Sequence, residues 1–117
     1  MPERRAHDYL PMSEAMFHVL LSLADGGAHG YGIMKGVAER TDGRVQLSTG
    51  TLYGIVKRLL ADGLIQEVRR RGADRGERRR RQYLLTPFGR EVATAEAARL
   101  KGLVAAARAA SLLPRRV

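Results

Sequence analysis

The chain of 117 residues contains no cysteine, no tryptophan and no long apolar run. Without cysteine it can form no disulfide and offers no thiolate for catalysis, which fits a reducing compartment. No segment approaches the roughly 20 apolar residues of a transmembrane helix, and the first residues lack the apolar stretch of a signal peptide. We therefore expect a soluble, cytoplasmic protein with no membrane partner.

The chain also has fewer acidic than basic residues, 12 Asp and Glu against 21 Lys and Arg, so its formal net charge is +9. The sequence pI of about 11.0 implies an acidic partner, most often nucleic acid. A chain of this length forms one domain with a modest core.

Capping residues and apolar spacing predict three short helices in the first half. Ser13 is a good N-cap for an apolar helix that Gly26 and Gly27 end. The second helix runs from about Tyr31 to Arg40, and its apolar spacing assigns Tyr31 to the core. Residues 1–12 are polar and contain proline, which predicts a loose arm.

The third helix starts after the capping residue Ser48 and ends at Asp62 and Gly63. Its predicted buried stripe consists of Leu52, Ile55, Val56, Leu59 and Leu60. The opposite face is small, hydroxylic and basic, so it can lie close to a phosphate backbone and still reach base edges.

Two short strands, 64–68 and 83–85, flank a loop rich in arginine. Residues 69–81 hold eight arginines and two acidic residues, a net charge of +6. Together with the three helices, this hairpin predicts a mainly α fold: a winged helix-turn-helix whose wing grips a polyanion.

The last predicted helix starts at Thr86 and Pro87 and ends near Ser111 or Leu113. Some 25 helical residues span close to 40 Å, more than a small domain can cover with its own core. We therefore expect its stripe of mostly small residues to pair with a second copy. The predicted dimer-interface residues are Val92, Ala95, Leu100, Leu103 and Ala107. The predicted division is an arm (1–12), a DNA-binding domain (13–86), a dimerisation helix (87–113) and a tail (114–117).

Four motifs match those of a known protein family in their order and spacing. They are HGYGI (29–33), STGTLY (48–53), LLADGLI (59–65) and YLLTPFG (83–89). The chain resembles the PadR family of bacterial transcriptional regulators, in its short branch with a single C-terminal helix. The resemblance implies a homodimeric winged helix-turn-helix that binds a two-fold symmetric operator and represses transcription.

The chain departs from the family pattern in two places. Gly54 stands where the family often has proline, which should loosen the first turns of the recognition helix, and the wing is unusually long and rich in arginine. Some short-branch relatives bind flat aromatic drugs between tryptophan side chains at the dimer interface. This chain has no tryptophan, which argues against that mode of ligand binding. Whether a small-molecule effector releases the protein from DNA stays open.

We expect the third helix to enter the major groove and the wing to follow the flanking backbone or minor groove. Lys57 is the best candidate on the helix for a phosphate contact. For Tyr53 two roles stay open: contact with DNA, or packing against the wing or the second helix. The candidate DNA-binding residues are Thr49, Thr51, Tyr53, Lys57, Arg58, Arg70, Arg71, Arg75, Arg78, Arg79 and Arg80.

Other functions fit the sequence less well. His7, His18 and His29 do not form a metal set, and His29 is expected to hydrogen-bond the backbone. Ser48 and Ser111 lack a nearby base, so we expect no enzymatic activity and no cofactor. An RNA-binding or ribosome-associated basic protein is the main alternative, since an arginine loop also grips folded RNA. A protein-interaction module, or a wing that is only a solvated charge run, are further alternatives.

Overall fold

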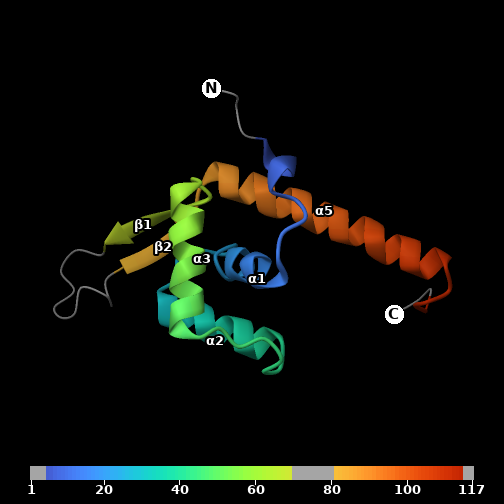
Figure 1. The fold of residues 1–117 in the computed structure, drawn as a ribbon, viewed down its shortest axis with the longest axis horizontal. Coiled ribbons are helices and arrows are strands. Elements are labelled where there is room, and N and C mark those ends of the chain that lie inside the picture. Colours follow the sequence, from blue (N-terminus) through green and yellow to red (C-terminus); the bar gives the residue numbers. More distant parts are fainter. Residues whose placement is uncertain (1–4, 70–80, 115–117) are drawn as a thin grey trace.

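The computed structural model describes residues 5–69 and 81–114 and has the predicted fold class, mainly helical with one hairpin (Figure 1). The three short helices precede an antiparallel hairpin, and a long helix follows it. The elements are η1 (Ala6–Tyr9), α1 (Glu14–Ser22), α2 (Gly30–Arg40), α3 (Thr49–Ala61), β1 (Ile65–Arg69), β2 (Arg81–Leu85) and α5 (Pro87–Ala109).

Side-chain caps begin three of the helices where the sequence predicts. The Ser13 hydroxyl accepts from the amide of Met16 at 3.1 Å, and the Ser48 hydroxyl accepts from the amide of Thr51 at 3.1 Å. Thr86 caps α5 in the same way, and Pro87 supplies the first helical residue. Each cap satisfies an amide that has no partner within the helix, which fixes where the helix starts.

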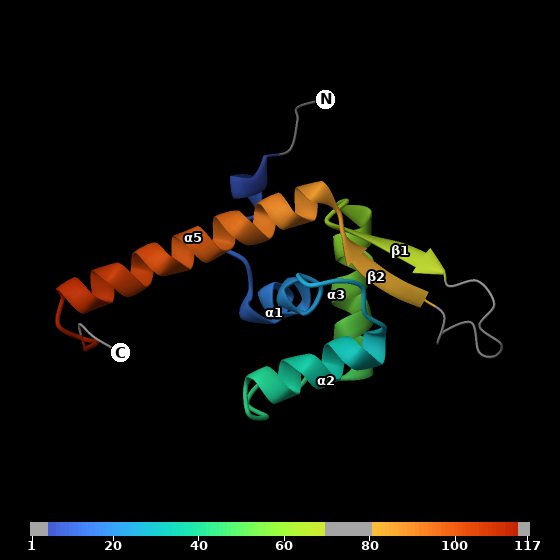
Figure 2. The ribbon, with the colours of Figure 1, turned by 180° about the vertical axis from the view of Figure 1, so that it is seen from behind.

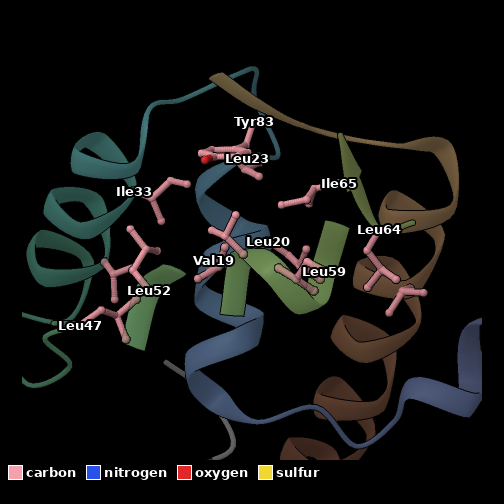
Figure 3. Close-up of a cluster of buried hydrophobic side chains, with 13 residues drawn as sticks. Val19, Leu20, Leu23, Ile33, Leu47, Leu52, Leu59, Leu64, Ile65 and Tyr83 are labelled. Carbon is pink, nitrogen blue, oxygen red and sulfur yellow. The ribbon is translucent and has the colours of Figure 1, made fainter. Parts of the chain in front are cut away.

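The core gathers around α1, which lies between α2 and α5 (Figure 3). Its members come from every helix from α1 onward and from both strands: Val19, Leu20, Leu23, Ile33, Val37, Leu47, Leu52, Val56, Leu59, Leu64, Ile65, Tyr83 and Val92. The expectation that Tyr31 belongs to the core is wrong, because this side chain is 75% exposed and Ile33 and Val37 form the buried line of α2.

The hairpin is tied to the start of α2 as well as being paired with itself. Its register runs from Ile65 opposite Leu85 to Arg69 opposite Arg81. Ala28 adds a short antiparallel bridge to Tyr83, with the two amides donating at 3.2 and 2.9 Å. His29 Nδ1 donates to the carbonyl of Arg81 at 3.0 Å, which confirms the expected hydrogen bond to the backbone.

The N-terminal segment is packed on α5 from residue 5 onward, in contrast to the loose arm that was expected. Tyr9 meets Phe88 edge to face with ring centroids 5.7 Å apart. Ala6, Tyr9 and Met12 pack against the core, and the Met12 amide donates to the buried carboxylate of Glu96. These apolar side chains cover α5 and explain why the segment is docked.

α5 has a buried N-terminal half and an exposed C-terminal half. Gly89, Val92 and Glu96 are buried, so Val92, a predicted dimer-interface residue, belongs to the chain's own core and has no surface to offer a second copy. The C-terminal half extends beyond the other helices in both views (Figures 1 and 2). The helix ends at Ala109, slightly before the predicted end, and no helix in the described residues is long and apolar enough to cross a membrane.

Candidate nucleic-acid interface

The outward face of α3 has almost no side chain along its centre. A Cβ on Gly50 or on Gly54 would have no neighbour within 4 Å. Leu52, Val56 and Leu59 are buried on the opposite face, which confirms the predicted orientation of the helix. The backbone of α3 is therefore open to close approach by a partner along two turns.

Hydroxyl and basic side chains border this bare face. Thr49, Tyr53 and Lys57 form one edge at a spacing of four residues, and Thr51 and Arg58 lie on the other edge. All five are exposed. At the start of the helix the amides of the first turn and the positive end of the helix dipole favour an anion.

Tyr53 packs against the second helix and also keeps an exposed edge. Its hydroxyl lies over Gly30 so closely that a Cβ on Gly30 would collide with it. The Tyr53 side chain is still 41% exposed. The packing that the sequence suggested is therefore present, and contact between the exposed edge and DNA stays a prediction.

A cleft beside the start of α3 brings Thr49 and Tyr53 together with Arg81 and Tyr83 of β2. Arg81 was not among the predicted DNA-binding residues. The guanidinium Nε of Arg81 lies 3.5 Å from a carboxylate oxygen of Glu67. Burial, and then the neighbouring Tyr53 and Glu67, raise the pKa of the Tyr83 phenol, so it stays protonated and uncharged near neutral pH.

Strand alternation is the signal that could have identified Arg81. Tyr83, an aromatic residue of the second strand, is expected to be buried. Side chains two residues apart in a strand lie on the same face, so Arg81 shares the face of Tyr83. Arg81 therefore lies on the face of the hairpin that turns toward the helices. Charge alone does not distinguish Arg81 from the other seven arginines of residues 69–81, so only its place on the strand reveals it.

Arg58 lies apart from this cleft. Its Nε is 3.9 Å from a carboxylate oxygen of Asp62, and its side chain is 73% exposed. Together with Asp8, Tyr9 and Asp62 it lines a shallow depression beside the N-terminal segment. Thr49 and Tyr53 thus belong to one side of α3 and Arg58 to the other.

The sequence profile of the Transcriptional regulator PadR-like family matches residues 19–95, well over half of the chain. The chain belongs to this family. A relative, an uncharacterised 37.1 kDa protein in transposon TN4556 of Streptomyces fradiae, is 40% identical over 95 residues. The match covers 79% of this chain and 25% of that protein, so this chain spans about a quarter of the length of the curated relative it matches.

Solved structures share the fold of this PadR-like chain. A PadR family transcription regulator from Clostridium difficile superimposes with a TM-score of 0.69 at 22% identity, covering 82% of this chain and 96% of that one. Bacillus subtilis PadR in complex with operator DNA gives a TM-score of 0.63 at 22% identity, covering 73% of this chain and 47% of that one. At these identities the likeness shows the winged-helix fold. The family is one of transcriptional regulators rather than enzymes.

The base of the PadR-like wing lies within the described residues, and its arginine-rich part does not. Arg69 and Arg81 pair across the hairpin, and the Glu67 carboxylate lies 4.0 and 3.5 Å from their Nε atoms. Among the residues that the structure describes, no three His, Cys, Asp or Glu side chains form a metal site. The predicted contacts that fall outside the described residues are Arg70, Arg71, Arg75, Arg78, Arg79 and Arg80.

Proposed function

We propose that the chain is a sequence-specific, homodimeric repressor that inserts α3 into the major groove of a two-fold symmetric operator. The observation that carries this proposal is the bare outward face of α3, where Gly50 and Gly54 meet open space between hydroxyl and basic edges. Such a face lets the helix backbone approach DNA closely while side chains at its edges reach bases and phosphates.

The charge of the wing supports a second contact outside the major groove. Residues 69–81 carry a net charge of +6, and the described base of the wing places Arg81 beside the start of α3. Arginines of a wing suit narrow A·T-rich minor grooves, whose negative potential is enhanced. Bacillus subtilis PadR, which shares the fold, has been solved with operator DNA.

The exposed apolar side chains in the C-terminal half of α5 are the basis for proposing a homodimer. Leu103 is 55% and Val104 39% exposed, and alanines around them would let two helices approach closely. Of the predicted interface residues, Ala95, Leu100 and Ala107 are partly buried, which leaves surface for a partner. Leu103→Glu should convert a dimer to a monomer in sedimentation experiments, because the charge would be buried in the interface. A wild-type chain that sediments as a monomer at micromolar concentration would overturn this part.

The proposed function is tested by selecting bound fragments from genomic DNA at moderate salt and footprinting the enriched site. A dimer predicts a protected inverted repeat with half-sites about one helical turn apart. Structured RNA is the competitor, because it tests the main alternative. If folded RNA displaces the enriched duplex at equal concentration, or if all fragments are retained equally, the chain is a general polyanion binder.

A further inference from the structure

α2 exposes an aromatic side chain and a basic one on a single face. Tyr31 is 75% exposed, which is the second-highest exposure among the large hydrophobic side chains of the described residues. Lys35 follows one helical turn later and is also exposed. Next to Lys35 around the helix, an added Cβ on Gly32 would meet only Ala28, at 4.0 Å. This side of α2 is therefore open to solvent.

The first turn of α2 is held beside both elements of the candidate interface. Ala28 is bridged to Tyr83, and His29 Nδ1 donates to the Arg81 carbonyl at the base of the wing. Gly30 lies under the hydroxyl of Tyr53 on α3. Tyr31 is the next residue, so its position is set by contacts with the wing and with the recognition helix.

Positions around the α2 axis place Tyr31 and Lys35 on the free side of the helix, with Tyr31 on the part of that side toward α3 and Lys35 further round. Gly30 faces α3, whereas Gly36 faces α1, where an added Cβ would lie 3.7 Å from the Ser22 hydroxyl. At about 100° per residue, Tyr31 and Lys35 lie in the exposed arc between these two contacts, with Tyr31 nearer to Gly30. The surface formed by α3 therefore continues onto α2 through Tyr31.

We propose that Tyr31 and Lys35 bind the phosphate backbone beside the groove that α3 enters. In a helix-turn-helix the helix before the recognition helix crosses the backbone. The Tyr31 hydroxyl would donate to a phosphate oxygen, and the Lys35 ammonium would pair with a phosphate through a charge-assisted hydrogen bond. This inference rests on the proposed function, since it needs α3 in the groove.

The test measures the affinity of Tyr31→Phe and Lys35→Gln for the selected operator and for a scrambled duplex, each over a range of salt. Both variants should lose affinity for both duplexes, by about two- to tenfold for each subunit that contacts DNA, because each subunit loses one hydrogen bond that carries no sequence information. Lys35→Gln should also flatten the log–log salt slope by about 0.9 for each phosphate that the lysine no longer neutralises, whereas Tyr31→Phe should leave the slope unchanged.

Lys101→Gln is the matched control. Lys101 is exposed on α5, which lies on the opposite side of the molecule from α2 in both views (Figures 1 and 2), and its replacement changes the net charge equally. This control should bind both duplexes like the wild type. Unfolding curves of all variants should coincide, because none of the three side chains is buried.

Two results would overturn the inference while the proposed function stands. One is wild-type affinity of both α2 variants, and the other is a loss of affinity for the operator with wild-type affinity for the scrambled duplex, which would indicate base contacts. If the wild-type chain retains neither duplex, the proposed function fails as well.

Discussion

Gly30 and Gly89 stand where two parts of the chain approach too closely for a side chain. A Cβ on Gly30 would collide with the Tyr53 hydroxyl, and a Cβ on Gly89 would collide with the carbonyl of Leu64. The Leu64 carbonyl also accepts from the amide of Thr86 at 3.0 Å. These contacts join the start of α5 to Leu64, which follows the turn at the end of α3, so they fix α5 relative to α3.

Gly89→Ala should lower the free energy of unfolding by about 1–3 kcal/mol, because the obstructing atom is backbone and cannot rotate away. Gly54→Ala is the control, since it lies in a helix with open space around it. It should raise the free energy of unfolding by up to about 1 kcal/mol through helix propensity. Urea unfolding of the three proteins compares these values. Equal urea midpoints for Gly89→Ala and the wild type would mean that α5 can shift to make room for the methyl group with no loss of stability.

Glu96 gives the fold a dependence on acid pH. Its carboxylate is almost fully buried and accepts two hydrogen bonds from Arg99, at 2.7 and 2.8 Å. These hydrogen bonds lower the pKa of Glu96 below its ordinary value of 4.5. A lowered folded-state pKa stabilises the fold above about pH 4.5, and this contribution disappears as the pH falls through that pKa.

Glu96→Gln should therefore have a lower thermal midpoint than the wild type at pH 7, and the two midpoints should converge as the pH falls from 5 toward 3. The amide keeps the size of the side chain but loses the charge that Arg99 and the Met12 amide stabilise. Thermal scans at several pH values measure the difference. A gap that stays constant with pH would show that packing, and not ionisation, is responsible.

At the residue scale, the sequence could predict caps and apolar stripes but not all partners. The hydroxyl of Ser48 acts within its own first turn, so the sequence alone locates it. Tyr31 has the spacing of a core residue, but only the packing of α2 on α1 and α3 decides which edge of the apolar stripe is covered. Glu96 is buried because a distant segment, residues 5–12, docks on α5.

At the scale of elements, α3 is a continuous helix from Thr49 to Ala61 in spite of Gly54. The expected loosening of its first turns does not interrupt the helix, because Ser48 caps the first turn and Leu52 and Val56 anchor the other face. Gly54 then leaves a gap on the outward face.

Gly54→Leu should weaken operator binding by at least about tenfold, since a large side chain would hold the helix away from the base edges. It should not lower the free energy of unfolding, because no atom lies within 4 Å of a Cβ at this position. Gel-shift titration together with urea unfolding measures both properties. Gly54→Ala is the size control and should bind more nearly like the wild type. Full affinity of Gly54→Leu would exclude a close approach of this face to DNA.

The order of the elements could be predicted because each carries a local signal, whether a cap, a turn or an alternation. The bridge between Ala28 and Tyr83 could not, since it joins residues far apart in the sequence and has no side-chain pattern of its own. The same reason hides the cleft that unites Thr49 with Arg81. The contacts that assemble the candidate site are long-range, whereas the signals in the sequence are local.

At the scale of the whole molecule, the positive charge is concentrated in one segment. The chain has a net charge of +9, and residues 69–81 account for +6 of it. The described base of this segment stands beside α3, whereas α5 extends away from it toward the far end (Figure 1). We therefore expect the charge of this segment to attract an approaching duplex.

Replacing Arg78, Arg79 and Arg80 with alanine should weaken binding to every sequence and flatten the salt dependence. About ten phosphate contacts in a dimer give a log–log slope on the order of −9, and removal of up to six would make it shallower by up to about 5. The prediction rests on charge alone, since these arginines lie outside the described residues. Lys101→Gln with Arg108→Gln, on α5, is the control for removal of charge elsewhere and should leave the slope almost unchanged. If the triple variant keeps the wild-type affinity at both low and high salt, Arg78, Arg79 and Arg80 do not contact DNA.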